Sequence, residues 1–186
     1  HSIPLIVYAD PAVLLARAQQ LGLLLKLHPL ESLSVDLITS LDILPAGELY
    51  VRPCCCKVAV QPGVLDVGNA DYVLQCLALA AGDCSLFPDR LALVTAPIQK
   101  SIINDAGIAF SGHTEFLQAQ SGTDKVVMML ATDTLRVALV TTHMALRDVA
   151  DAVTPLNVQR TLDIVNADMR RYFTHHAPEI LVCGLN

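Results

Sequence analysis

Short apolar runs alternate with helical patterns along this chain, and this alternation constrains its fold more than any other feature. Residues 3–9 form a compact run rich in β-branched side chains, and Asp10 with Pro11 then supplies the N-cap and first turn of a helix that Gly22 ends. Further strands are predicted around residues 23–27, 41–44, 48–60 and 91–95. Because such alternation builds a parallel or mixed sheet covered by helices, we expect an α/β fold.

The second half of the chain continues the pattern. Asn69 is placed to cap a helix that reaches about residue 81, and a short helix is predicted from about Glu115. Thr154 and Pro155 begin a long helix whose apolar residues recur at spacings of three and four. Strands are also predicted over residues 125–131, 135–141 and 179–183.

The loop-rich stretch over residues 96–112 is the best candidate for a crossing between domains. We expect residues 1–97 to belong to a first α/β domain and residues 98–186 to a second. The chain begins on a predicted strand and stops at the carboxyl edge of another, where α/β proteins usually place a ligand-binding loop. We therefore expect the fold to be truncated at both ends.

Composition narrows the classes of protein to which the chain could belong. Apolar residues make up 53% of it, but charged, proline or glycine residues interrupt every apolar stretch before the roughly 18 residues of a membrane span. The net charge of −6 is mild and no basic run occurs, so neither a membrane nor a nucleic acid is expected as a partner. The six cysteines lack disulfide or zinc spacing, which favours reduced thiols in a soluble cytoplasmic protein.

His113 and Thr114 form the first candidate site. They follow the glycine-containing stretch 104–112 and stand at the predicted N-terminus of a helix. Backbone N–H groups and the helix dipole favour an anion there, such as phosphate or carboxylate, and the imidazole and hydroxyl would complete a small pocket. The alternative is that Thr114 only caps the helix and His113 is a turn residue.

His143 is the second candidate. It follows two threonines at the predicted carboxyl end of a buried strand, where α/β proteins keep ligands. Imidazole is a common metal ligand, and Asp148 or a backbone carbonyl would orient its second nitrogen. Because no second ligand stands at a recognisable short spacing, a hydrogen-bonded histidine at a strand end is the alternative.

Ordered motifs then carry a resemblance to a known family. The motifs are TAPIQK (95–100), INDAG (103–107), FSGHTEF (110–116), VVMMLA (126–131), TTH (141–143) with LRD (146–148), and ILVCGLN (180–186). In order and spacing they resemble the 4-hydroxythreonine-4-phosphate dehydrogenases, the metal-dependent oxidoreductases of vitamin B6 and pyridoxal phosphate biosynthesis. The resemblance extends from about Pro4 to the end, and it is dense from Thr95 onward.

The resemblance implies an isocitrate/isopropylmalate-dehydrogenase-like fold of α/β/α layers, in a homodimer with its active site at the subunit interface. It also implies NAD- or NADP-dependent oxidation of 4-phosphohydroxy-L-threonine, a small phosphorylated hydroxy amino acid, with decarboxylation to 3-amino-2-oxopropyl phosphate. His113 and Thr114 match the substrate-binding pair. His143 matches one of three histidines that bind a divalent metal (zinc, cobalt or magnesium), which acts as a Lewis acid on the hydroxyl oxygen.

The chain also departs from the family. Members usually carry glycine, histidine, glycine and proline at the positions of Ala96, Gln99, Ser101 and Ala145. The family's catalytic aspartates, its other metal histidines and its main dinucleotide contacts have no match here, so we expect the fragment to be inactive alone. The alternatives are a paralogous dehydrogenase of another hydroxy acid phosphate, a non-catalytic dimerisation or folding fragment, and a transferase, for which no phosphate- or acyl-carrying motif is present.

Overall fold

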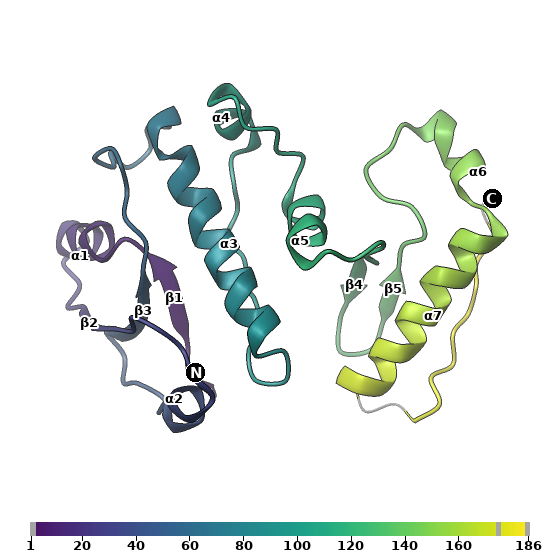
Figure 1. The fold of residues 1–186 in the computed structure, drawn as a ribbon, viewed down its shortest axis with the longest axis horizontal. Helices are drawn as coiled ribbons and strands as arrows, with labels where there is room; N and C mark the ends of the chain where they lie inside the picture. Colours follow the sequence, from purple (N-terminus) through teal and green to yellow (C-terminus); the bar gives the residue numbers. More distant parts are fainter. Residues whose placement is uncertain (1–2, 174–175, 185–186) are drawn as a thin grey trace. The chain divides into compact units, whose positions relative to one another are not determined.

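A computed structural model describes residues 3–173 and 176–184, and it divides the chain into two compact units, His1–Gly122 and Thr123–Asn186. The first unit combines a parallel sheet with helices, and the second combines a β-hairpin with helices (Figure 1). The predicted α/β class is therefore confirmed. The domain boundary expected after residue 97 stays a prediction. Within the described ranges, no helix is both long and apolar enough to cross a membrane.

Three parallel strands form the sheet of the first unit. They are β1 (Ile6–Ala9), β2 (Lys26–Pro29) and β3 (Glu48–Pro53), with β3 between the other two. Val51 of β3 is in register with Val7 of β1, and its side chain is completely buried. A β-branched residue suits this central position because neighbouring strands flank it on both sides. The parallel arrangement agrees with the sequence prediction.

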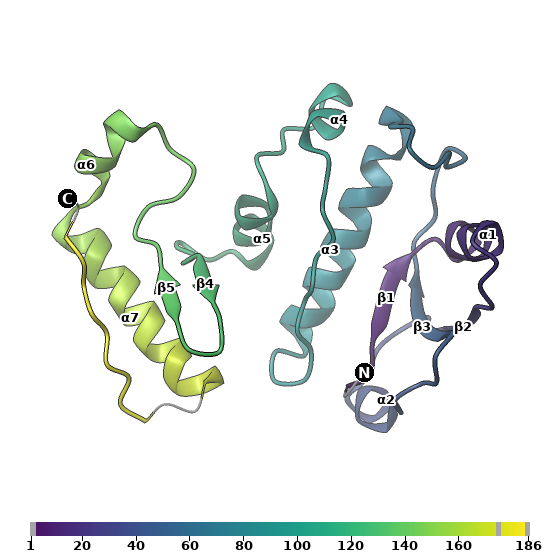
Figure 2. The same cartoon turned by 180° about the vertical axis from the view of Figure 1, so that it is seen from behind.

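The first unit also contains five α-helices and one 3₁₀ turn among its described residues. They are α1 (Pro11–Gln20), α2 (Val35–Ser40), α3 (Ala70–Leu86), which follows the 3₁₀ turn η1 (Val67–Asn69), α4 (Lys100–Asp105) and α5 (His113–Ser121). In both views α3 lies beside β1 (Figure 1, Figure 2). As predicted, Asp10 caps α1, since its carboxylate accepts a hydrogen bond from the Ala12 N–H at 2.8 Å, and Pro11 stands in the first turn.

Asn69 precedes α3 as predicted, but its side chain does not cap the helix. Its amide instead bonds both backbone groups of Val58. The Val58 N–H donates to Oδ1 at 3.1 Å, and Nδ2 donates to the Val58 carbonyl at 3.0 Å. Asn69 therefore fixes the loop after β3 against the start of α3. The helix was predicted correctly and the role of Asn69 was not.

Several predicted strands are irregular in the structure. Residues 41–44, 91–95 and 179–183 have no strand assignment, and Val94 is 91% exposed. A strand needs a neighbour for its backbone N–H and C=O groups, and none of the described strands pairs with these segments. Apolar, β-branched composition is therefore insufficient here without a partner strand.

A hydrophobic core in the first unit packs α3, α4 and the entry to α5 together. Its buried members are Ala70, Leu77, Ile103 and Phe110, and Ile103 is completely inaccessible to solvent. Since Ile103 belongs to α4 and Phe110 lies just before α5, this core holds the N-terminus of α5 against α3. Truncating such a buried side chain costs about 2–5 kcal/mol.

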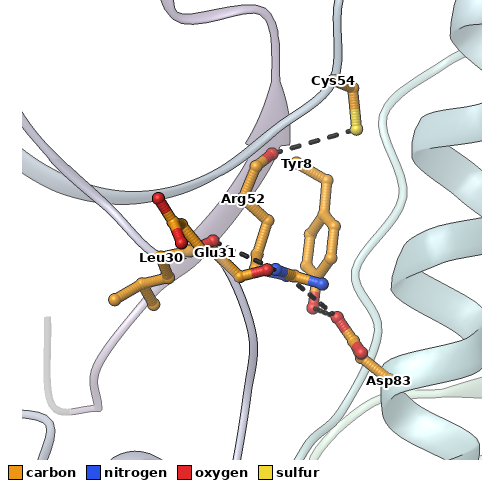
Figure 3. A network of polar contacts seen from close by, with 6 residues as sticks. All are labelled: Tyr8, Leu30, Glu31, Arg52, Cys54 and Asp83. Atoms are coloured by element: carbon orange, nitrogen blue, oxygen red, sulfur yellow. Dashed lines mark hydrogen bonds and ion pairs between the residues drawn. The ribbon is translucent and has the colours of Figure 1, made fainter.

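A buried polar network ties the sheet to α3 (Figure 3). Asp83 of α3 accepts hydrogen bonds from the Tyr8 hydroxyl at 2.9 Å and from Arg52 Nε at 3.3 Å. The Arg52 guanidinium also donates to the carbonyls of Leu30, at 3.0 Å, and Glu31. Burial, followed by the hydrogen bond to Asp83, raises the pKa of the Tyr8 hydroxyl. Each charge in the network is thus compensated, as buried charges require.

The second unit is a hairpin packed with helices. Its elements are β4 (Met129–Ala131) antiparallel to β5 (Arg136–Ala138), the 3₁₀ turn η2 (Leu146–Asp148), α6 (Val149–Ala152) and α7 (Pro155–Tyr172). Thr154 caps α7 as predicted, because its hydroxyl accepts from the Asn157 N–H at 3.2 Å. The Arg136 guanidinium of β5 lies 4.8 Å from the centre of the Phe173 ring, just after α7.

Candidate functional site

The first candidate site is the N-terminus of α5. His113 and Thr114 are the first two residues of this helix, which begins two residues earlier than the predicted start at Glu115. Gly112 occupies the N-cap position with an extended backbone (φ 165°, ψ 178°). Since Gly112 has no side chain to cap the helix, the first backbone N–H groups have no side-chain acceptor at that position. The predicted placement of the pair at a helix N-terminus is confirmed.

A clamp built by Asn104 fixes the loop that leads to this site. The Asn104 amide donates to the Phe110 carbonyl at 3.0 Å, and its Oδ1 accepts from the Phe110 N–H, also at 3.0 Å. Between them, Gly107 turns the chain with φ 82°, a conformation that favours glycine. The clamp and the buried Phe110 side chain together place the residues that follow, including Gly112 and His113.

His113 is held at a defined angle but has a polar atom without a partner. The Phe110 ring packs edge-on against the imidazole, with 6.3 Å between the ring centres and 77° between the planes. Among the described residues, no group forms a hydrogen bond with the buried His113 Nε2. A buried polar atom left in this state costs about 1–3 kcal/mol, so such atoms point to a missing partner.

Glu115 has a second atom of this kind. Its Oε2 is buried, and no hydrogen-bond partner for it occurs among the described residues. A third, Arg136 Nε, belongs to the second unit. Two of the three unpartnered atoms among the described residues thus come from the first turn of one short helix. An anionic ligand would satisfy the imidazole nitrogen, whereas the carboxylate oxygen of Glu115 requires a hydrogen-bond donor.

Lys100 approaches the same place from α4. A Cβ atom built on Gly112 would lie 3.3 Å from Lys100 Nζ and 3.1 Å from Glu115 Oε2. The ammonium group and the carboxylate oxygen therefore face one small space beside Gly112. Sequence reasoning missed Lys100, because it lies on another helix and no short spacing connects it to His113. Glu115 lies within the motif FSGHTEF (110–116) but was given no role of its own.

The second candidate, His143, has a different setting. β5 ends at Ala138, so His143 lies in the loop that leads to η2, and its side chain is exposed. The prediction that it ends a buried strand is wrong, since β5 is a short strand of a hairpin with partly exposed residues. In residues 3–173 and 176–184, no group of three His, Cys, Asp or Glu side chains is arranged to hold a metal ion.

A hollow of about 640 Å³ lies beyond the carboxyl ends of β1 and β3, between α1 and residues 56–62. Its size suits a small ligand. Its polar side chains are already engaged, however: Asp10 caps α1, Arg17 donates to Gln20 at 2.6 Å, and Lys57 pairs with Asp71 at 2.5 Å. It is therefore a weaker candidate than the N-terminus of α5.

The cysteines form no disulfide, and the prediction of unpaired thiols is confirmed. Cys54, Cys56 and Cys76 gather around Tyr72 in the first unit. Burial, followed by contact with Cys54, raises the pKa of the Cys76 thiol to about 12. A thiol that stays protonated is a poor nucleophile and a poor metal ligand, so Cys76 is not a candidate for either role.

Comparison with known proteins gives consistent matches. The family model described as "Pyridoxal phosphate biosynthetic protein PdxA" matches residues 1–186. A 4-hydroxythreonine-4-phosphate dehydrogenase of Yersinia pseudotuberculosis is 47% identical over 184 residues, which are 99% of this chain and 54% of the relative. One from Pseudomonas putida is 49% identical over 183 residues, or 98% of this chain and 54% of the relative.

A solved structure agrees with these sequences. The crystal structure of a 4-hydroxythreonine-4-phosphate dehydrogenase from Burkholderia phymatum matches with a TM-score of 0.73 at 28% identity, covering 89% of this chain and 48% of the other. The chain spans about half the length of the curated relatives it matches.

Proposed function

The chain belongs to the PdxA family of pyridoxal phosphate biosynthetic proteins, and from this membership we propose that it forms part of a dehydrogenase acting on 4-phosphohydroxy-L-threonine. The oxidant would be NAD or NADP, and decarboxylation of the oxidised substrate would give 3-amino-2-oxopropyl phosphate. The relatives that match almost all of the chain are named for this dehydrogenase activity. The role of the chain in it would be to bind one end of the substrate.

The observation that carries the proposal is the unpartnered, buried Nε2 of His113 at the start of α5. An imidazole N–H, the Thr114 hydroxyl and the first backbone N–H groups of the helix are all donors that suit a phosphate or carboxylate. Because the Nε2 atom is shielded from water, a ligand that bonds it does not compete with solvent there. The substrate carries both kinds of anionic group, so this pair would fix one of them.

The metal is a separate part of the proposal. His143 would give one ligand to a zinc, cobalt or magnesium ion, but a catalytic zinc site takes about three protein ligands and an open position. The described residues include no such group of three, so they do not fit a complete metal centre. They also contain no glycine-rich dinucleotide fingerprint.

Association into a homodimer is proposed on the basis of exposed apolar side chains. Leu24, Val94, Leu146 and Leu181 are each at least 88% exposed. Large apolar side chains that are exposed to this extent are often covered at an interface between protein chains. At micromolar concentration, sedimentation should show a dimer or larger species, and a well-behaved monomer would contradict the proposal. The unpaired thiols fit a cytoplasmic location.

Kinetics of a His113→Ala variant test the proposed substrate role. In the full-length enzyme, the substitution should lower kcat/KM about tenfold or more, which corresponds to about 1.4 kcal/mol. His28→Ala is the matched control, because His28 bonds Glu48 at 2.6 Å on β2, away from α5, and should leave kcat/KM nearly unchanged. Unchanged kinetics in the His113 variant would remove the assignment.

The nearest competing function is a dehydrogenase of another hydroxy acid phosphate, such as a four-carbon sugar acid. An anion site at α5 would serve either substrate, so the structure of this site favours neither. Turnover of the full-length enzyme on both compounds separates them, since the proposal requires the hydroxy amino acid phosphate to have the larger kcat/KM.

A further inference from the structure

The sequence contains four lysines, and Lys100 differs from the other three. Lys26 pairs with Glu48 at 3.0 Å, Lys57 pairs with Asp71 at 2.5 Å, and Lys125 donates to the Asn157 carbonyl at 3.0 Å. Among the described residues, no acceptor lies within hydrogen-bonding or ion-pairing distance of Lys100. Lys100 is an exposed residue, but its ammonium nitrogen lies 3.3 Å from the position that a Cβ of the buried Gly112 would occupy.

Two charged groups face the space beside Gly112, at the N-terminus of α5 that also carries His113. Lys100 Nζ and Glu115 Oε2 both lie close to the position that a Cβ of Gly112 would occupy, and the imidazole of His113 follows directly in the chain. The atoms His113 Nε2 and Glu115 Oε2 are buried, and neither has a hydrogen-bond partner within residues 3–173 and 176–184. A cation, an imidazole and the positive end of a helix dipole together favour an anion.

Resting on the proposed function, we propose that Lys100 is a third substrate-binding residue, whose ammonium group binds, with His113 and Thr114, an anionic group of the substrate beside Gly112. The anionic group is a phosphate or a carboxylate, since an ammonium group binds both as a point charge. Glu115 faces the same space, and its negative charge opposes a bare anion there. The side chain of Lys100 is the positive charge that outweighs it.

Direct binding of an anion by Lys100 and a purely structural role of Lys100 predict different effects of substitution. Lys100→Met should weaken inhibition of the full-length enzyme by inorganic phosphate about tenfold or more, because a charge-assisted contact is lost. Glu115→Gln should strengthen the same inhibition, because it removes a repelling charge. If the two side chains served only to stabilise the fold near α5, both substitutions would weaken phosphate binding or neither would change it, and the proposal would be overturned.

Matched control variants distinguish a local effect of Lys100 from an effect of the net charge of the protein. Lys26→Met removes one positive charge from β2 in the same unit and should leave the phosphate inhibition constant unchanged. Lys100→Arg keeps the charge and should retain most of the binding. An equal loss in the Lys26 and Lys100 variants would overturn the proposal, since it would reflect only net charge.

Substrate analogues identify the anionic group. If Lys100 binds the phosphate, the rise in KM caused by Lys100→Met should disappear with 4-hydroxythreonine, which lacks the phosphate. If it binds the carboxylate, the rise should disappear with an analogue that lacks the carboxyl group. If Lys100→Met raised KM equally with both analogues and with the substrate, the proposal that Lys100 contacts the anionic group directly would be overturned.

Failure of this inference differs from failure of the proposed function. An enzyme that oxidises the substrate and loses activity in His113→Ala, but is indifferent to Lys100→Met, overturns the role of Lys100 alone. An enzyme that does not oxidise the substrate overturns the proposed function. Phosphate binding measured by calorimetry on the Lys100→Met and Glu115→Gln variants would then still decide whether Lys100 binds an anion.

Discussion

The N-terminus of α5 and the loop that carries His143 were both predicted as ligand sites, and their structures differ. At α5, a buried core, the Asn104 clamp and the Phe110 ring hold His113 in place, and two buried polar atoms have no partner in the part of the chain that the structure describes. His143 is exposed in an irregular loop. The difference teaches that local packing can position a candidate site within an isolated segment. A metal site needs ligands that are distant in sequence.

The largest effect expected from this difference is that the 186-residue chain does not turn over substrate. Because one imidazole gives only a small part of the affinity of a three-ligand site, the 186-residue chain should bind divalent metal weakly and produce no NADH from substrate. Elemental analysis after dialysis and an absorbance assay for NADH measure this. Zinc held at one ion per chain, or measurable NADH, would show that the His143 loop is as complete a site as the α5 N-terminus.

The next largest effect is expected where α3 is fixed to the sheet. Asp83→Ala leaves the Arg52 guanidinium buried without its carboxylate, so the free energy of unfolding should fall by about 3–5 kcal/mol. Tyr8→Phe removes one hydrogen bond and should cost about 1 kcal/mol. Denaturant unfolding measures both. Asp71→Ala, at the exposed pair with Lys57, is the control and should cost less than about 1 kcal/mol.

A smaller effect is expected from filling the space beside Gly112. The backbone there is extended, so alanine is conformationally allowed, but its Cβ would crowd Lys100 Nζ and Glu115 Oε2. Gly112→Ala should weaken phosphate inhibition of the full-length enzyme by about tenfold, or about 1.4 kcal/mol, with little loss of stability. Gly82→Ala is the matched control, because its Cβ would meet no atom within 4 Å. Equal phosphate inhibition constants in the Gly112→Ala and Gly82→Ala variants would show that the anion does not bind beside Gly112.

Much of the fold could be predicted from local signals in the sequence. Asp10 with Pro11 and Thr154 with Pro155 marked two helix starts, because a capping side chain bonds backbone within the next few residues. The segment 91–95 was predicted incorrectly, since strand formation depends on a neighbour and not on composition alone. The short helix α2, which Ser34 caps, was not predicted.

The candidate site was likewise predictable only in part. His113 and Thr114 stood out because a helix N-terminus has a local sequence pattern. Lys100 did not, because its approach to Gly112 depends on how α4 and α5 pack through Ile103 and Phe110. The exposure of His143 was also missed, since the sequence did not show that β5 would end at Ala138.

A phosphate titration of this chain followed by NMR tests the central claim most directly, since it reads both regions in one sample. The account predicts saturable shifts of the backbone amide signals of His113 and Thr114 and of the His113 imidazole, with no saturable shift at His143. Replacing Lys100 by Met should weaken the saturation at α5. Small linear shifts of the same size at His113 and His143 would contradict the account, because they would show that the N-terminus of α5 binds an anion no better than an exposed loop does.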